Sequence, residues 1–172
     1  GAQDNVKILT SCPSCLQGLN RYQDDLQNGL LEADYIVIEM AREACGGDLT
    51  GARVAVLGAA FKPNSDDVRD SPALHVAGQL QLQGAEVRVF DPKAMENSRI
   101  LFPTLHYAES VLDTCLGVDL VMLLTEWPEF CSIDPDELKS TVRTASIIDG
   151  RNCLDASAWR SAGWTYRGLG RP

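Results

Sequence analysis

One loop of this chain gathers residues that could bind an anion. The apolar run Arg53–Leu57 stops at Gly58, and the connection after it contains Lys62 and Arg69 before Ser71-Pro72 opens a helix pattern. Cationic side chains, small residues that allow close backbone approach and a helix amino end all favour phosphate. Open α/β sheets bind ligands where a strand feeds a helix in this way. The loop therefore predicts a phosphate-binding site.

The two neighbouring aspartates of this loop cannot bind phosphate themselves. We expect Asp66 and Asp67 to hold Lys62, Arg69 or the loop backbone in place, or to cap the helix. Ser71-Pro72 needs no function, because serine at the N-cap and proline in the first turn are ordinary helix-start residues.

Polar residues also follow three other apolar runs. Since parallel strands end at one edge of a sheet, we expect these residues to lie near Lys62. Arg151 would then be a second cation of the same pocket, while Glu126 and Trp127 either line the pocket or pack beneath Pro128. The three segments are Phe90-Asp91-Pro92, Thr125-Glu126-Trp127 and Asp149-Gly150-Arg151.

Apolar runs of strand length alternate with helix patterns along most of the chain, which predicts an α/β fold with a Rossmann-like, doubly wound parallel sheet. Runs as apolar as Leu120–Leu124 indicate strands that helices cover on both faces. The predicted strands are 54–57, 86–91, 105–107, 120–124, 146–149 and 165–168, and the predicted helices are 72–83, 108–116, 134–140 and 156–161.

Three motifs in this order resemble the C-terminal, nucleotide-binding domain of the UDP-glucose/GDP-mannose dehydrogenase family. They are Ala60-Phe-Lys-Pro-Asn-Ser-Asp-Asp-Val-Arg-Asp-Ser-Pro72, Phe90-Asp-Pro-Lys93 and Asp149-Gly-Arg-Asn152. The resemblance runs from about residue 46 to 172, and the first motif is closer to UDP-glucose 6-dehydrogenases. It implies a role in an enzyme that oxidises a sugar C6 alcohol to a uronate in two hydride transfers to NAD.

The resemblance also implies roles for four residues. Phe61 and Lys62 match the pair that contacts the UDP-sugar, and Arg151 matches an arginine that contacts UDP. Arg69 matches the arginine that reaches NAD held by a partner domain.

Two family elements do not occur in this sequence. There is no Gly-Gly-x-Cys-Phe-Pro-type segment with a nucleophilic cysteine, and Gly58-Ala-Ala-Phe-Lys-Pro is not the glycine fingerprint of an NAD-binding domain. We therefore expect the NAD-binding and catalytic half to be missing, and this chain alone to give no turnover.

The length, composition and charge of the chain limit the kinds of partner that it can bind. The 172 residues, 45% of them hydrophobic, suffice for one core and a short appendage, and the net charge of −9 argues against nucleic acid. No apolar run nears the ~20 residues of a membrane span, so we expect no membrane partner and a cytoplasmic location. Gly46-Gly47 suggests a boundary between an appendage at 1–47 and a UDP-binding domain at 48–172.

The appendage has a different pattern. Val6–Leu9 could be a short strand, and helix patterns over 11–22 and 31–45 predict a helical hairpin. Two segments, Thr10-Ser-Cys-Pro-Ser-Cys-Leu-Gln-Gly-Leu19 and Ala33-Asp-Tyr-Ile-Val-Ile-Glu-Met-Ala-Arg42, resemble the tail of the cysteine-rich (CCG-type) domain of iron–sulfur oxidoreductases. The resemblance covers about residues 7–45, lacks the upstream Cys-Cys-Gly element of that domain, and suggests a composite chain. Cys12 and Cys15 would be two of the roughly four ligands that a zinc or iron–sulfur site needs, or a redox pair.

Three functions follow from the sequence. The first and favoured one is a UDP-sugar-binding module, the second a redox or metal module built on Cys12 and Cys15, and the third a fusion scaffold that binds nothing. UDP titration separates the first from the third, and metal or thiol analysis detects the second. Whether the chain forms a homo-oligomer is left open by the sequence.

Overall fold

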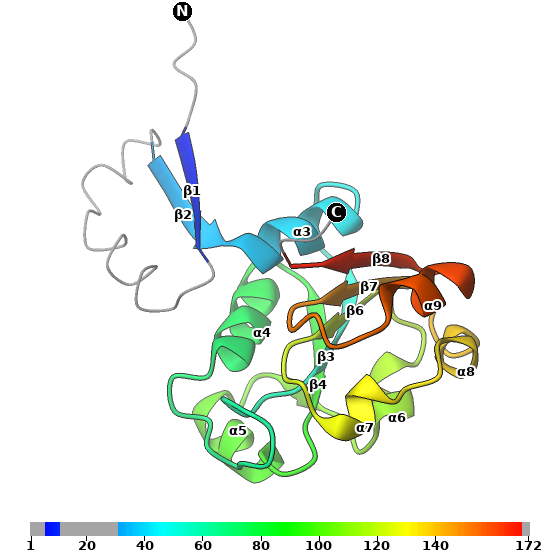
Figure 1. The fold of residues 1–172 in the computed structure, drawn as a ribbon. Helices are drawn as coiled ribbons and strands as arrows, with labels where there is room; N and C mark the ends of the chain where they lie inside the picture. Colours follow the sequence, from blue (N-terminus) through cyan, green and yellow to red (C-terminus); the bar gives the residue numbers. More distant parts are fainter. Residues whose placement is uncertain (1–5, 11–30, 170–172) are drawn as a thin grey trace, which may run out of the picture.

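Six short strands form one parallel sheet in the computed structural model, which describes residues 6–10 and 31–169 (Figure 1). The strand order is β5-β4-β3-β6-β7-β8, and every neighbouring pair is parallel. The strands are β3 (Arg53–Leu57), β4 (Glu86–Phe90), β5 (His106–Tyr107), β6 (Leu120–Leu123), β7 (Ser146–Asp149) and β8 (Thr165–Gly168). The predicted α/β class and parallel sheet are confirmed.

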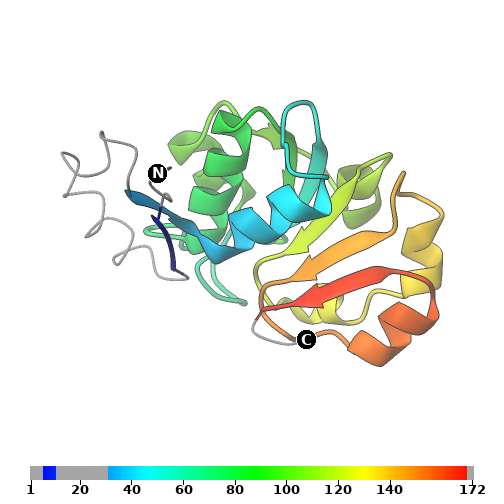
Figure 2. The ribbon, with the colours of Figure 1, turned by 90° about the horizontal axis from the view of Figure 1, so that it is seen from above.

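Helices cover both faces of this sheet. The chain runs outward from β3 to β4 and β5 and then returns to β6, so right-handed crossovers place the two sets of helices on opposite faces. Figures 1 and 2 show α3 and α4 on one side and α6, α8 and α9 on the other. The helices are α3 (Ile36–Ala44), α4 (Pro72–Leu82), α5 (Met95–Leu101), α6 (Val111–Cys115), α7 (Pro128–Cys131), α8 (Pro135–Lys139) and α9 (Ala156–Ser161).

The central strands carry the core. All residues of β6 and β7 are buried, and the continuous apolar run of β6 predicts this for a strand covered on both faces. α4 begins as expected, with Ser71 at the N-cap accepting from the Leu74 N–H and Pro72 in the first turn. The sequence patterns did not predict α5, in which only Ser98 is buried, or the single turn of α7.

The predicted N-terminal hairpin is not what the described residues show. Residues 31–35 form β2 (Leu31–Tyr35), which pairs in parallel with β1 (Val6–Thr10). The reason is a strict alternation of apolar and acidic residues from Leu31 to Tyr35, the period of a strand rather than a helix. The other predicted helix, 11–22, lies outside the described residues.

α3 begins only after this strand, at Ile36. It buries Val37, Ile38 and Ala41 in the same apolar cluster as the sheet. Among the described residues, no helix combines the length and the apolar character needed to cross a bilayer.

Candidate functional site

A buried aspartate ties together three loops at the carboxyl edge of the sheet. Asp91, 1% exposed after β4, accepts hydrogen bonds through Oδ2 from the N–H groups of Ala59 (2.8 Å) and Ala60 (2.9 Å) in the β3–α4 loop. The indole Nε1 of Trp127, after β6, donates to the same oxygen at 3.1 Å. Oδ1 accepts from the N–H groups of Lys93 and Ala94. One carboxylate therefore fixes the chain after β3, β4 and β6.

The root of the β3–α4 loop is equally constrained. Gly58 has φ +103°, and a Cβ added there would lie 2.5 Å from Cβ of Thr125. Thr125 is buried and donates its hydroxyl to the Ala60 carbonyl at 2.9 Å, while Ser71 donates to the Ala59 carbonyl at 2.6 Å. Only glycine suits this left-handed backbone conformation and close approach.

A second buried aspartate shapes the loop after β7. Asp149, 0% exposed, accepts from the N–H groups of Arg151 (3.0 Å) and Leu154 (2.9 Å) and from the Tyr166 hydroxyl (2.9 Å). The Arg151 side chain leaves this loop to pair, through Nε, with the Glu126 carboxylate after β6.

The Arg151–Glu126 pair is partly exposed and ionised. The hydrogen bond from Arg151 lowers the pKa of Glu126 below its usual value, and the same bond raises the pKa of Arg151. Both groups therefore stay charged at neutral pH.

Arg151 lines a pocket of about 270 Å³ at the carboxyl edge of the sheet. The amino end of α4 forms one wall, and residues after β6 and β7 form others. Helix amino ends and arginine both favour anions, and the remaining lining is apolar. The lining residues are Val37, Pro72, Ala73, Val76, Leu124, Gly150, Arg151 and Leu169. The pocket can thus hold an anion beside an apolar group.

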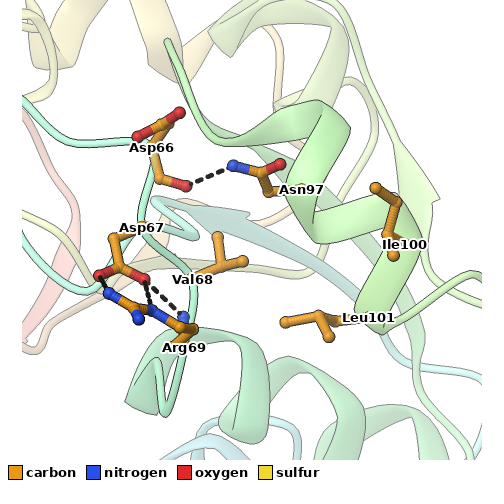
Figure 3. Close-up of a pocket in the computed structure, with 7 residues that line it drawn as sticks. All are labelled: Asp66, Asp67, Val68, Arg69, Asn97, Ile100 and Leu101. Atoms are coloured by element: carbon orange, nitrogen blue, oxygen red, sulfur yellow. Dashed lines mark hydrogen bonds and ion pairs between the residues drawn. The ribbon is translucent and has the colours of Figure 1, made fainter.

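The tip of the β3–α4 loop, residues 61–70, borders a different and larger pocket of about 460 Å³ (Figure 3). Arg69 donates to both carboxylate oxygens of Asp67, at 3.0 and 2.8 Å. This pairing lowers the pKa of Asp67 to about 2 and raises that of Arg69. Ile100 and Leu101 of α5 form the apolar wall across from the ion pair in Figure 3.

The structure does not bring the predicted site residues into one pocket. Arg151 lines the smaller pocket and Arg69 the larger one, whereas Phe61 and Lys62 are exposed on the loop tip and line neither. Asp67 holds Arg69, as predicted, and Lys62 lies close enough to contribute to the lowered pKa of Asp67. Trp127 packs in the core, and Glu126 is the partner of Arg151.

The small residues at the start of the loop do allow close packing, but the group that approaches their backbone is a side chain of the protein itself. The N–H groups of Ala59 and Ala60 are already bound by the carboxylate of Asp91. They are the groups with which a dinucleotide-binding loop would hold a pyrophosphate. The residues present at this loop therefore do not fit NAD, and the anion-binding groups left at this edge are side chains and the end of α4. The sequence shows Asp91 at the end of a predicted strand, but it does not show that the Asp91 side chain is buried.

No group of three or more His, Cys, Asp or Glu side chains that could hold a metal occurs among the residues the structure describes. Cys12 and Cys15 lie outside those residues, so the predicted pair stays a prediction. Burial raises the pKa of Cys115 to about 12 and is also the main cause of the raised pKa of Cys153. These two thiols are poor nucleophiles at neutral pH.

A parallel sheet with a ligand-sized pocket at its carboxyl edge is the arrangement of nucleotide-binding α/β domains. Comparison with known proteins agrees. The model of the UDP-glucose/GDP-mannose dehydrogenase family, UDP binding domain, matches residues 55–156. The chain therefore belongs to this family, of which it carries the UDP-binding domain.

Similar proteins bear the same description. The chain is 43% identical over 129 residues to a UDP-glucose 6-dehydrogenase of Rhizobium meliloti (strain 1021), a match that takes in 75% of this chain and 30% of the relative. It is 39% identical over 127 residues to UDP-glucose 6-dehydrogenase TuaD of Bacillus subtilis (strain 168), a match that covers 73% of this chain and 28% of the relative. The chain thus spans under a third of the length of these relatives.

Solved structures share the fold. A UDP-glucose dehydrogenase from Pyrobaculum islandicum superposes with a TM-score of 0.62 at 35% identity, over 76% of this chain and 28% of that one. A UDP-D-ManNAc dehydrogenase from Pyrococcus horikoshii superposes with a TM-score of 0.63 at 30% identity, over 78% of this chain and 29% of that one.

The N-terminal resemblance to an iron–sulfur oxidoreductase domain is not supported. The family model that matches there, over residues 20–50, is a domain of unknown function, DUF3400. Two segments suggested the resemblance: the cysteine-containing segment 10–19 lies before this match, and segment 33–42 lies within it. Two short segments with only two cysteines were too small a signal to identify that domain.

Proposed function

We propose that the α/β body binds the UDP moiety of a nucleotide sugar at the carboxyl edge of its sheet. In this proposal it is the substrate-binding part of an NAD-dependent enzyme of the UDP-glucose 6-dehydrogenase type, which oxidises the sugar C6 alcohol to a uronate. The observation that carries the proposal is the family match together with Arg151 and the amino end of α4 in one pocket.

Each proposed contact has a physical reason. Arg151 offers a guanidinium fixed between the β6 and β7 ends, suited to a phosphate oxygen. The positive end of α4 adds attraction for the same charge. Lys62 would supply a second, exposed cation from the loop tip, and the exposed ring of Phe61, 51% accessible, would supply an apolar surface beside it.

NAD enters this proposal only through Arg69. The β3–α4 loop does not fit a dinucleotide, so another domain would bind the cofactor, which accepts hydride from the sugar. Arg69 is 85% exposed and could offer a charge to a phosphate of NAD bound beyond this chain. Catalytic groups would come from that other part as well.

The proposal is tested by calorimetric titration of UDP into four proteins. Lys62→Ala and Arg151→Ala should each weaken binding by about 1–3 kcal/mol, as for the loss of a charge-assisted hydrogen bond. Arg69→Ala, the matched control, should bind UDP like the wild type. Unchanged affinity for Arg151→Ala, with melting temperatures preserved, would disprove the proposed site.

A further inference from the structure

Arg151 uses only some of its hydrogen-bond donors within the protein. Its Nε donates to Glu126, and its backbone N–H donates to Asp149. Among the described residues, neither of its terminal Nη nitrogens makes a hydrogen bond. The guanidinium thus keeps two parallel donors, the arrangement that binds phosphate in a bidentate manner.

Glu126 is placed to control those donors. It follows β6, whereas Arg151 follows β7, and these strands are neighbours in the sheet. The bond to Nε fixes the side of the guanidinium that faces Glu126. It also leaves a negative charge beside any anion that Arg151 would bind, because the carboxylate remains ionised.

We propose that Glu126 is a specificity-determining positioning residue: it holds Arg151 ready for a diphosphate and disfavours ligands in proportion to their negative charge. This inference rests on the proposed UDP site. Repulsion from Glu126 grows with the charge of the ligand. Free UDP ends in a phosphate monoester with a second ionisation near pH 6, so at neutral pH it carries about one charge more than a UDP-sugar. Glu126 would therefore favour the nucleotide sugar over free UDP.

Two substitutions separate the two roles. Glu126→Gln keeps an oxygen acceptor for Arg151 but removes the charge, so it should bind UDP on the order of threefold to tenfold more tightly at low ionic strength. The gain for UDP-glucose should be smaller, and both gains should shrink as salt is added. Glu126→Ala removes the acceptor too, and should bind UDP less tightly than Glu126→Gln.

Glu129→Gln is the matched control, since it removes the same charge from an exposed glutamate nearby. It should leave the ratio of the UDP and UDP-glucose affinities unchanged. Glu126→Asp, which retains the charge, should not tighten binding. Calorimetric titrations of each variant with both ligands provide the affinities.

Equal gains for both ligands in Glu126→Gln, or no gain for UDP, would overturn the inference. A loss of UDP affinity in Arg151→Ala combined with either result would overturn it while leaving the proposed UDP site intact. If Arg151→Ala binds UDP normally, the proposed site itself fails, and this inference fails with it.

Discussion

Two arginine–carboxylate pairs lie near the carboxyl edge of the sheet, and they are held very differently. Arg151 pairs with Glu126 across two neighbouring strand ends, and each side chain is 36% exposed. Arg69 pairs with Asp67, two residues earlier in the same loop, and its side chain is 85% exposed. The first pair joins distant parts of the chain, whereas the second joins two residues of the same loop, although each arginine lines a pocket.

The difference comes from what lies beneath each pair. Asp149 fixes the loop that carries Arg151, and Asp91 fixes the roots of the loops after β3, β4 and β6. The loop tip, residues 61–70, has no buried carboxylate of this kind among the described residues. A cation on a fixed loop can present its donors at a defined place, which binding requires.

The largest effect should come from removing the buried carboxylate of Asp91. Asp91→Ala would leave the N–H groups of Ala59 and Ala60 and the indole of Trp127 without their partner. We expect a loss of about 3–5 kcal/mol in the free energy of unfolding, measured by urea denaturation. Asp67→Ala, at the exposed tip, is the control and should unfold like the wild type. Similar losses for both variants would abolish the distinction between root and tip.

A smaller loss should follow from Gly58→Ala at the loop root. The new Cβ would meet Thr125 and the residue would keep a positive φ, which together should cost about 2–4 kcal/mol of unfolding free energy. Gly51→Ala is matched to it, since Gly51 has φ +72° but nothing within 4 Å of the added Cβ. That control should cost about 1–2 kcal/mol. If the two variants lose the same stability in urea, contact with Thr125 contributes nothing.

The smallest effect concerns the ionisation of Asp67. Its folded-state pKa of about 2 depends mainly on Arg69, so Arg69→Ala should raise it toward the ordinary ~3.9, followed by NMR of the carboxyl carbon. A carboxylate whose pKa is lowered on folding stabilises the folded protein at pH values above its unfolded-state pKa. This stabilisation is lost as the pH falls through the folded-state pKa. Because Asp67 is exposed, the melting temperature should not change measurably. An Asp67 pKa that stays near 2 in the variant would point to another partner.

Much of the fold follows from the sequence, because the β3 and β6 segments are nearly uninterrupted apolar runs that only a covered parallel sheet can bury. Residues 31–35 were misassigned since a helix pattern extended back across a segment whose own alternation has a period of two. α5 was missed because its single buried residue, Ser98, gives no apolar stripe.

The site was less predictable. The sequence shows that Lys62, Arg69 and Arg151 are cations, but it does not show which of them line the same pocket. That depends on the hydrogen bonds that join loops from distant strands. The Asp91 hydrogen bonds join residues more than 30 positions apart and occupy two N–H groups of the loop in which the sequence predicts a phosphate site. No local pattern reveals such a contact.

The central claim, that the anion site lies at Arg151 and not at the Arg69–Asp67 pair, is tested most directly by mapping UDP-induced shifts in the backbone amide NMR spectrum. We predict the largest shifts at residues 150–152 and at the amino end of α4, with much smaller shifts at 66–69 and in α5. Shifts concentrated at 66–69 and α5, with none at 150–152, would contradict the account.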